Sequence, residues 1–279
     1  MSAAVTATRS AISSSSLGSS GSCSGARFMM VPRYPSPMAP NPKAPRSALA
    51  IYAHPDDAEL ACGGTLATWA AEGTTVHIVV VCRGDKGSSV PVDPDQLSTV
   101  REAESRKAAL LLGAHEWQCL GHNDGELSES DLLRRELVRL VRTLRPEVVL
   151  TADPTSVFLG PGYFNHRDHR VVGWSVLDAV SPGSSNPNYF PDLGAAHQVQ
   201  RVLLSASLEP DFWVDVSSGV DAKVLAVLAH ETQLVGGSEL GVDASLVGEM
   251  IRSRASVEAK GTSLQLAEKF RQLRLVQDE

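Results

Sequence analysis

The sequence has few cysteines, few aromatic residues and no long uncharged apolar run. Its four cysteines among 279 residues include no CxxC pair, which excludes a disulfide-rich mini-protein and favours a reduced, cytoplasmic setting. No apolar stretch approaches the roughly 18–20 residues that cross a bilayer, so we expect no membrane span. The chain also lacks the GxSxG of serine hydrolases and a GxGxxG after its first predicted strand, which disfavours serine hydrolysis and dinucleotide chemistry.

Acidic side chains are absent before Asp56, where all five charged residues are basic (Arg9, Arg27, Arg33, Lys43 and Arg46). The rest of the chain therefore carries 20 basic against 32 acidic side chains, and such an acidic body argues against a nucleic-acid partner. Residues 1–46 are rich in Ser, Ala, Gly and Pro and have no strand or helix period. We expect a disordered tail there. Its composition resembles a transit peptide only faintly, and an inert tail is the simpler interpretation.

Beyond residue 46 the apolar pattern predicts alternating strands and helices. Strands are expected at 47–53, 74–82, 116–120, 146–152 and 201–206, and helices at 58–73, 95–112, 131–144, 169–180, 218–231 and 244–274. This rhythm implies an α/β fold, a Rossmann-like three-layer sandwich with a mostly parallel sheet and helices on both faces. We expect a single domain over residues 47–279. Ligands of such sheets bind beyond the carboxyl ends of the strands.

The helix expected at 95–112 is amphipathic. We assign to its apolar side the residues Val100, Ala103, Ala108, Leu111 and Leu112. Arg101 and Glu104 lie three residues apart on this helix, and this spacing can mean no more than a surface ion pair worth a few tenths of a kcal/mol.

The first predicted strand runs directly into His54-Pro55-Asp56-Asp57. Imidazole and carboxylate groups together suit Zn²⁺. Since adjacent aspartates cannot both point the same way, one can ligate a metal while its neighbour faces the substrate. Two carboxylates held close together also repel, and a divalent cation would relieve that repulsion. The alternative is that Asp56 or Asp57 only caps the following helix, which we disfavour because three metal-competent residues occur together.

A second cluster, Asn165-His166-Arg167-Asp168-His169-Arg170, follows the strand at 146–152 and a loop rich in Pro and Gly. Two histidines that flank a carboxylate at one-turn spacing offer a third metal ligand and an acid or orienting group. Alone, the HxDH pattern is compatible with an ordinary surface helix. Together with the first cluster it completes a three-ligand site with an open position, which is typical of catalytic zinc.

With these residues in place, the sequence resembles the PIG-L/LmbE-like family of zinc-dependent N-deacetylases. HPDDAELACGGTLA is similar to the family's opening AHPDD…GG motif, and NHRDHRVVG to its HxDH block. Supporting similarity comes from REAESRKAALLLG, HNDGEL and DAKVLAVLAHETQ, so that the resemblance covers about residues 49–230.

The resemblance implies that His54, Asp57 and His169 bind one zinc ion per chain. Asp56 is then the general base that takes a proton from the attacking water. His166 stabilises the oxyanion and protonates the leaving amine, and Asp168 holds the imidazole of His166. Some relatives assemble as trimers or hexamers, so a homo-oligomer is one option for this chain.

Substrate contacts are expected at Arg83, Asp124 and Tyr163, which follow strand ends or lie in segments that the family uses near its pocket. For Arg83 and Asp124, a purely structural role in a turn or loop is equally open. Mycothiol-type deacetylases place a tyrosine two residues before the non-ligand histidine, where this chain has Phe164, with Tyr163 one residue earlier. This difference favours the sugar-deacetylase branch. His230 and Gln233 either line the site or end a structural helix.

Our main hypothesis is therefore a zinc amidohydrolase that removes acetyl from an N-acetylglucosaminyl or related amino-sugar conjugate, a small-molecule partner. One alternative is an amidase that cleaves a larger thiol or glycoside conjugate. A more distant alternative is a non-catalytic metal- or sugar-binding module. Asp56 and His166 argue against a binding module, because binding alone would not require both residues.

Overall fold

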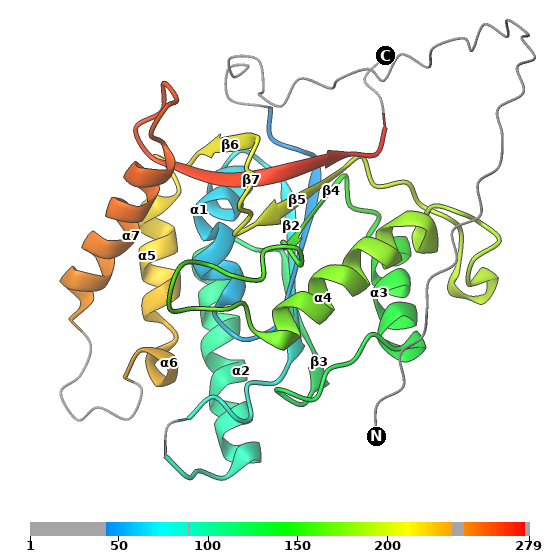
Figure 1. Ribbon diagram of the computed structural model, residues 1–279, viewed down its shortest axis with the longest axis horizontal. Coiled ribbons are helices and arrows are strands. Elements are labelled where there is room, and N and C mark those ends of the chain that lie inside the picture. The colour runs from blue at the N-terminus through cyan, green and yellow to red at the C-terminus, as the bar shows by residue number, and fades with distance from the viewer. Residues whose placement is uncertain (1–42, 89, 236–242, 277–279) are drawn as a thin grey trace, which may run out of the picture. The chain divides into compact units, whose positions relative to one another are not determined.

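Seven strands form one sheet in the computed structural model, which describes residues 43–88, 90–235 and 243–276 (Figure 1). The described residues all lie in the unit that spans residues 35–279, and all of the expected tail except residues 43–46 lies outside them. The strands are β1 (Ser47–Tyr52), β2 (Thr75–Cys82), β3 (Glu116–His122), β4 (Val148–Ala152), β5 (Arg201–Ser205), β6 (Phe212–Asp215) and β7 (Ala267–Arg274). The α-helices are α1 (Asp57–Ala71), α2 (Pro94–Leu111), α3 (Asp131–Leu144), α4 (Arg167–Asp178), α5 (Val220–Leu228), α6 (Glu231–Val235) and α7 (Ala244–Glu258), with short helical turns at Ala179–Ser184 and Pro191–Leu193.

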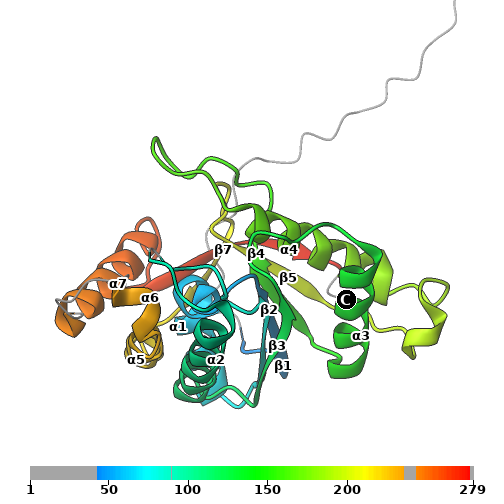
Figure 2. The ribbon, with the colours of Figure 1, turned by 90° about the horizontal axis from the view of Figure 1, so that it is seen from below.

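The strand order is β3-β2-β1-β4-β5-β7-β6. Strands β1 to β5 pair in parallel, whereas β7 pairs antiparallel with both β5 and β6. Because side chains alternate along a strand, β1 contributes to two cores: Ala50 packs in the cluster of Leu66 from α1, and Leu49 in that of Leu137 from α3. Helices α1, α2, α5 and α7 cover one face and α3 and α4 the other (Figure 2). The predicted α/β three-layer architecture is confirmed.

The helix predicted over 244–274 is wrong in its second half. Helix α7 ends at Glu258, and Ala267–Arg274 forms the strand β7 between β5 and β6. The residues of β7, AEKFRQLR, are mostly strong helix formers, so local preference suggested a helix. Pairing with two neighbouring strands overrides that preference, and it buries Phe270 completely. The short strand β6 was not expected.

Helix α1 is broken at Cys62, whose backbone angles are φ −145° and ψ 17°. The second half of the helix therefore has its own amino end, with amide groups that need acceptors. The carboxylate of Glu268 from β7 supplies them: Oε1 accepts from the amide of Gly64 at 3.0 Å and Oε2 from that of Thr65 at 2.8 Å. The strand that comes last in the chain, β7, thus caps the inner half of the first helix.

Lys223 of α5 completes this arrangement. Its Nζ donates to the carbonyl of Leu60 at 2.9 Å, on the other side of the break, and to Glu268 Oε1 at 2.6 Å. The carboxylate of Glu268 approaches the backbone of Gly64 so closely that a Cβ on Gly64 would lie 3.0 Å from Glu268 Oε1. The second glycine of the Gly-Gly pair is therefore required by packing.

None of the helices within the described ranges combines the length and the apolar character that a membrane crossing requires.

Candidate metal centre and active site

A pocket of about 420 Å³ lies where the segments after β1, β2, β3 and β4 meet, at the carboxyl edge of the sheet. Helix α6 adds one wall. The lining residues are His54, Asp56, Asp57, Lys86, Gly87, Arg101, Asp124, Gly125, Tyr163, His166, His169 and Gln233. The two clusters that the sequence analysis selected, more than 100 residues apart in the chain, therefore meet in one pocket.

Three potential ligand atoms converge in this pocket. His54 Nδ1 lies 3.2 Å from His169 Nε2, and Asp57 Oδ2 lies 3.4 Å from the first nitrogen and 3.2 Å from the second. Atoms that bind one zinc ion tetrahedrally at about 2.0–2.1 Å are about 3.3 Å apart. The spacing of the three atoms therefore fits a single metal ion of this kind.

The outward nitrogens of both imidazoles meet oxygen acceptors. His54 Nε2 lies 3.2 Å from Asp168 Oδ2, and His169 Nδ1 lies 3.0 Å from Asn165 Oδ1. If each outward nitrogen carries the ring proton, the inward nitrogens, His54 Nδ1 and His169 Nε2, present lone pairs to Asp57. Contacts of this kind fix the tautomer and orientation of metal-binding histidines, so the structure supplies both the ligands and their supports.

Two other groupings of possible ligands are less suitable. His166 lies near His54 and His169, with ligand atoms of the three within 4.8 Å of one another. Asp57 is preferred as the third ligand, because its Oδ2 lies 3.4 and 3.2 Å from the converging nitrogens of His54 and His169, whereas His166 Nδ1 already accepts from the amide of Asp168. His54, Cys82 and Asp124 also come together. Burial raises the pKa of the Cys82 thiol to about 11, and both carboxylate oxygens of Asp124 already accept from the amides of Gly84 and Lys86.

The charges of the convergent cluster are strongly coupled. Burial alone would lower the pKa of His54, but its contacts with Asp168 and Asp57 outweigh burial and raise that pKa. Burial would raise the pKa of Asp57, but His169 and His54 outweigh burial and hold it well below its usual range. The carboxylate is therefore ionised and demands a positive charge in the pocket, from a proton or from a metal ion.

Asp56 occupies the cap position of α1 but does not act as a cap. Its side chain makes no hydrogen bond to the amides of the helix, and its backbone has a φ of 87°, in the left-handed region that favours glycine. The carboxylate lines the pocket instead. Burial and the charge of Asp57 raise its pKa to about 7. The alternative that this residue merely caps the helix is therefore wrong.

His166 and Asp168 both lie at the site, but not in the expected relation. Asp168 Oδ2 lies 3.7 Å from His166 Nδ1, beyond hydrogen-bond distance, while it contacts His54 and accepts from the amide of Gly125 at 2.6 Å. His166 Nδ1 instead accepts from the backbone amide of Asp168 at 3.3 Å. Asp168 therefore orients His54, a correction of its expected role. The neutral His166 ring carries its proton on Nε2.

The structure places the three residues expected to contact substrate in different positions relative to the pocket. Tyr163 and Asp124 line the pocket, but Arg83 does not. Arg83 donates to Asp95 at 2.7 Å and to Asn123 at 3.1 Å, so its guanidinium stabilises neighbouring loops. These contacts favour the structural role that the sequence left open for Arg83, because a side chain that follows a strand end can still turn away from the pocket.

Arg101 was misassigned to the surface. Its side chain is 1% exposed, lines the pocket and donates to the carbonyls of Gly84 and Gly87. Glu104 does not pair with it but accepts from the amide and hydroxyl of Thr232. The buried side of α2 carries Leu97, Arg101, Ser105, Ala108 and Leu112, whereas Val100, Ala103 and Leu111 are exposed. The helical spacing of Leu97, Ala108 and Leu112 could have indicated this side.

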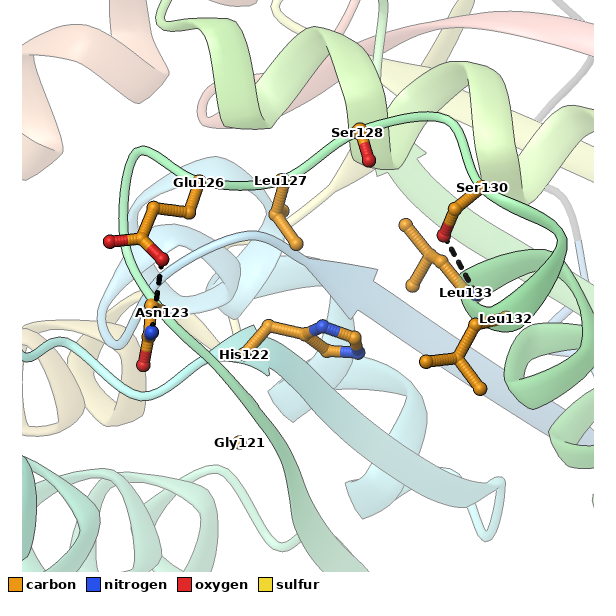
Figure 3. Close-up of a pocket in the computed structure, with 9 residues that line it drawn as sticks. All are labelled: Gly121, His122, Asn123, Glu126, Leu127, Ser128, Ser130, Leu132 and Leu133. Atoms are coloured by element: carbon orange, nitrogen blue, oxygen red, sulfur yellow. Dashed lines mark hydrogen bonds between the residues drawn. The ribbon is translucent and has the colours of Figure 1, made fainter.

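A second cavity, of about 350 Å³, lies beside the end of β3 (Figure 3). The loop after β3 separates the two cavities: Asn123 and Glu126 line this one, and Asp124 and Gly125 line the first. Its single imidazole, His122, lies 2.8 Å from a carboxylate oxygen of Glu136. Among the described residues, the groups of possible metal ligands include His54 of the first cavity and none of the residues that line this one, so the first is the candidate active site.

Comparison with known proteins agrees with this geometry. The model of the PIG-L family, described as GlcNAc-PI de-N-acetylase, matches residues 49–180. A diacetylchitobiose deacetylase of Thermococcus kodakarensis is 32% identical over 193 residues, which are 67% of this chain and 70% of that protein. A 1D-myo-inositol 2-acetamido-2-deoxy-alpha-D-glucopyranoside deacetylase of Rhodococcus jostii is 27% identical, and the match covers 78% of this chain and 93% of that protein.

Among solved structures, the fold is similar to that of N,N'-diacetylchitobiose deacetylase from Pyrococcus horikoshii. The TM-score is 0.72 at 24% identity, and the match covers 82% of this chain and 84% of that one. Because family matches, sequence identity and fold agree, this chain belongs to the PIG-L family.

Proposed function

We propose that this protein is a zinc-dependent hydrolase that removes the N-acetyl group from an N-acetylglucosaminyl conjugate. The observation that carries the proposal is the convergence of two imidazole nitrogens and one carboxylate oxygen, at 3.2–3.4 Å from one another, beside the free carboxylate of Asp56. The names of the two relatives, both deacetylases of acetylated amino sugars, support the class of substrate.

His54, Asp57 and His169 would hold one zinc ion per chain. A set of two imidazoles and one carboxylate leaves a coordination position open, as catalytic zinc requires. When bound, zinc supplies a Lewis acid for the amide carbonyl and lowers the pKa of the attacking water. Asp168 and Asn165 keep the two ligand imidazoles in the correct orientation.

Asp56 is the proposed general base. Its carboxylate lines the pocket next to the proposed ligand Asp57, and its raised pKa, about 7, suits a group that accepts a proton and returns it. In the forward reaction, Asp56 takes a proton from water while the water oxygen attacks the acetyl carbon. The C–N bond then breaks, and the proton passes to the leaving amine.

His166 is the proposed donor to the carbonyl oxygen. Its Nδ1 accepts from the amide of Asp168, so that Nε2 carries the proton of the neutral ring. Burial and the charge of His54 lower its pKa, which favours this neutral form. A neutral imidazole can stabilise a developing negative charge through a hydrogen bond, but it is a weak acid. We therefore assign oxyanion stabilisation to His166 and delivery of the amine proton to Asp56.

Tyr163 and Asp124 form the proposed substrate side of the pocket. The phenol of Tyr163 is half exposed at the rim, where it can contact a sugar hydroxyl or ring face. The two carboxylate oxygens of Asp124 accept from the amides of Gly84 and Lys86. Asp124 therefore shapes the loop after β2, and its remaining lone pairs are available to sugar hydroxyls.

The test combines metal analysis with acetate release from one preparation of the full chain. N-acetylglucosamine and diacetylchitobiose are incubated with the protein, with and without a chelator. We expect about one zinc per chain and chelator-sensitive release of acetate. In the Asp56→Asn variant, zinc content should remain while kcat falls by about 10²- to 10⁴-fold, the usual contribution of a general base.

The alternatives make different predictions in the same experiment. A conjugate amidase releases a free amine from a larger thiol or glycoside conjugate without acetate. A binding module retains metal or sugar but hydrolyses neither substrate. Full activity in the Asp56→Asn variant would show that the base is misassigned.

A further inference from the structure

The carboxylate of Asp56 is not fixed by its own helix. The residue has a strained φ of 87° and makes no side-chain bond to the amides of α1. A general base must be held close to the productive geometry, because a displacement of about 1 Å can cost about 10²-fold in rate. Some other part of the fold therefore has to hold this side chain.

Gln233 of the short helix α6 makes that contact. Its Nε2 donates to Asp56 Oδ2 at 3.2 Å and to the carbonyl oxygen of Pro55 at 3.3 Å. Its Oε1 accepts from the guanidinium of Arg101. Because a guanidinium can only donate, the amide must turn its oxygen toward Arg101 and its nitrogen toward Asp56.

Helix α2 fixes α6 in this position. Arg101 is fully buried and also donates to the carbonyls of Gly84 and Gly87 at 2.9 and 2.8 Å. One turn further along α2, Glu104 accepts from the amide of Thr232 at 2.9 Å and from its hydroxyl at 2.6 Å. Two consecutive residues of α6 are thus bound by two residues of α2.

We propose that Gln233 is a positioning residue for the proposed deacetylation: the chain Arg101–Gln233–Asp56 holds one oxygen of the base, so that the other can accept the proton of the attacking water. This inference rests on the proposed function, since it assigns Asp56 the role of base. Gln233 is proposed to act through the carboxylate of Asp56, to which its amide donates, and not as an acid or base itself.

The Gln233→Met variant tests the proposal, because methionine has a similar length but cannot donate to Asp56. We expect kcat to fall by about 10- to 100-fold, with KM and zinc content unchanged. The matched control is Glu231→Gln on the same helix, whose only described ion-pair partner is Lys107 at 3.9 Å. This control should keep the activity of the natural chain. An unchanged kcat in Gln233→Met overturns the proposal.

A double-mutant cycle distinguishes positioning from a general structural effect. In the Asp56→Asn background, Gln233→Met should lower the residual kcat by less than about twofold, because the group that it positions is already gone. A full 10- to 100-fold further loss contradicts the proposed coupling.

Crystal structures of the natural chain and of Gln233→Met give a readout that does not need activity. The carboxylate of Asp56 should leave its position in the variant, and an unmoved carboxylate contradicts positioning. If the natural chain releases no acetate, the proposed function fails, and the crystal structures decide about Gln233 separately.

Discussion

Two clusters of charged groups contact α1, the closed cluster of Lys223 and Glu268 at its break and the open cluster of His54, Asp57 and His169 at its start, and they differ in how their charges are matched. At the break in the helix, the ammonium of Lys223 and the carboxylate of Glu268 form a closed set with the carbonyl of Leu60 and two backbone amides. At the start of the helix, Asp57 meets two imidazole nitrogens that can offer only lone pairs when the rings are neutral.

The difference separates a structural cluster from a reactive one. In the closed cluster every described donor meets an acceptor, so a further ion has no role there. In the open cluster the ionised carboxylate of Asp57 faces a pocket and demands a further positive charge there, from a proton or from a metal ion. Burial of charge alone therefore does not indicate function, whereas a carboxylate in a pocket that demands a further positive charge does.

The largest expected effect comes from removing the charged ligand of the open cluster. In Asp57→Ala, two imidazoles remain, and we expect loss of stoichiometric metal together with a fall in kcat/KM of about 10³-fold or more. The free energy of unfolding of the metal-free protein should also fall at neutral pH, because the lowered pKa of Asp57 means that its ionised carboxylate is stabilised in the folded state. Elemental analysis, acetate release and urea denaturation measure the three quantities. One metal ion per chain in this variant would contradict the assigned ligand.

Breaking the closed cluster should lower stability without removing metal. Lys223→Met leaves the carboxylate of Glu268 buried without its cation, and we expect the free energy of unfolding to fall by about 3–5 kcal/mol. Metal content per folded chain should stay the same. Urea denaturation followed by circular dichroism measures the loss.

The matched control for Lys223 is Arg252→Met, because Arg252 forms an exposed ion pair with Asp221 on the same α5–α7 side of the molecule. Its loss should cost at most about 1 kcal/mol. Equal destabilisation by both variants would remove the distinction between the closed cluster and an ordinary surface pair.

A smaller effect is expected from the support of one ligand. Asn165→Ala removes the acceptor of His169 Nδ1, so the ring can rotate, and metal affinity should fall by about 10- to 100-fold. Asn165→Asp retains an oxygen acceptor and should restore most of that affinity. Competition with a chromogenic chelator measures both. If the two variants bind metal equally weakly, hydrogen bonding to His169 is not the reason.

The smallest effect concerns a charged group next to the open cluster but outside it. Arg83→Ala removes contacts with Asp95 and Asn123, both at the protein surface. Steady-state kinetics should give kcat and KM within about twofold of the natural chain. A large rise in KM would restore Arg83 to the substrate-binding residues.

The open cluster could be predicted from the sequence because it follows strand ends. His54, Asp57 and His169 come directly after predicted strands or at the start of a helix, and parallel strands bring such positions to one edge. Arg101 was not predicted at the site, and for Gln233 the sequence left open whether it lines the site or ends a structural helix. They reach the pocket from the middle of α2 and from α6, through tertiary contacts that leave no fixed spacing in the sequence.

The sequence did not predict the closed cluster, because this cluster also depends on tertiary contacts. Glu268 lies in a segment of helix-forming residues, and only its pairing with β5 and β6 makes it a strand. The role of Asp168 also depended on geometry. The family resemblance implied a contact with His166, whereas Asp168, at the amino end of α4, lies closer to His54.

The cap that Glu268 places on α1 also bears on the order of folding. The bond between its carboxylate and the amide of Gly64 joins residues 204 positions apart. Contacts of such long sequence separation form late, since the chain between them has to be ordered first. During synthesis, the helix that begins with Asp57 stays without its inner support until the ribosome has passed Glu268. The first helix of the fold therefore receives the acceptor for its inner amides from the last strand of the described chain.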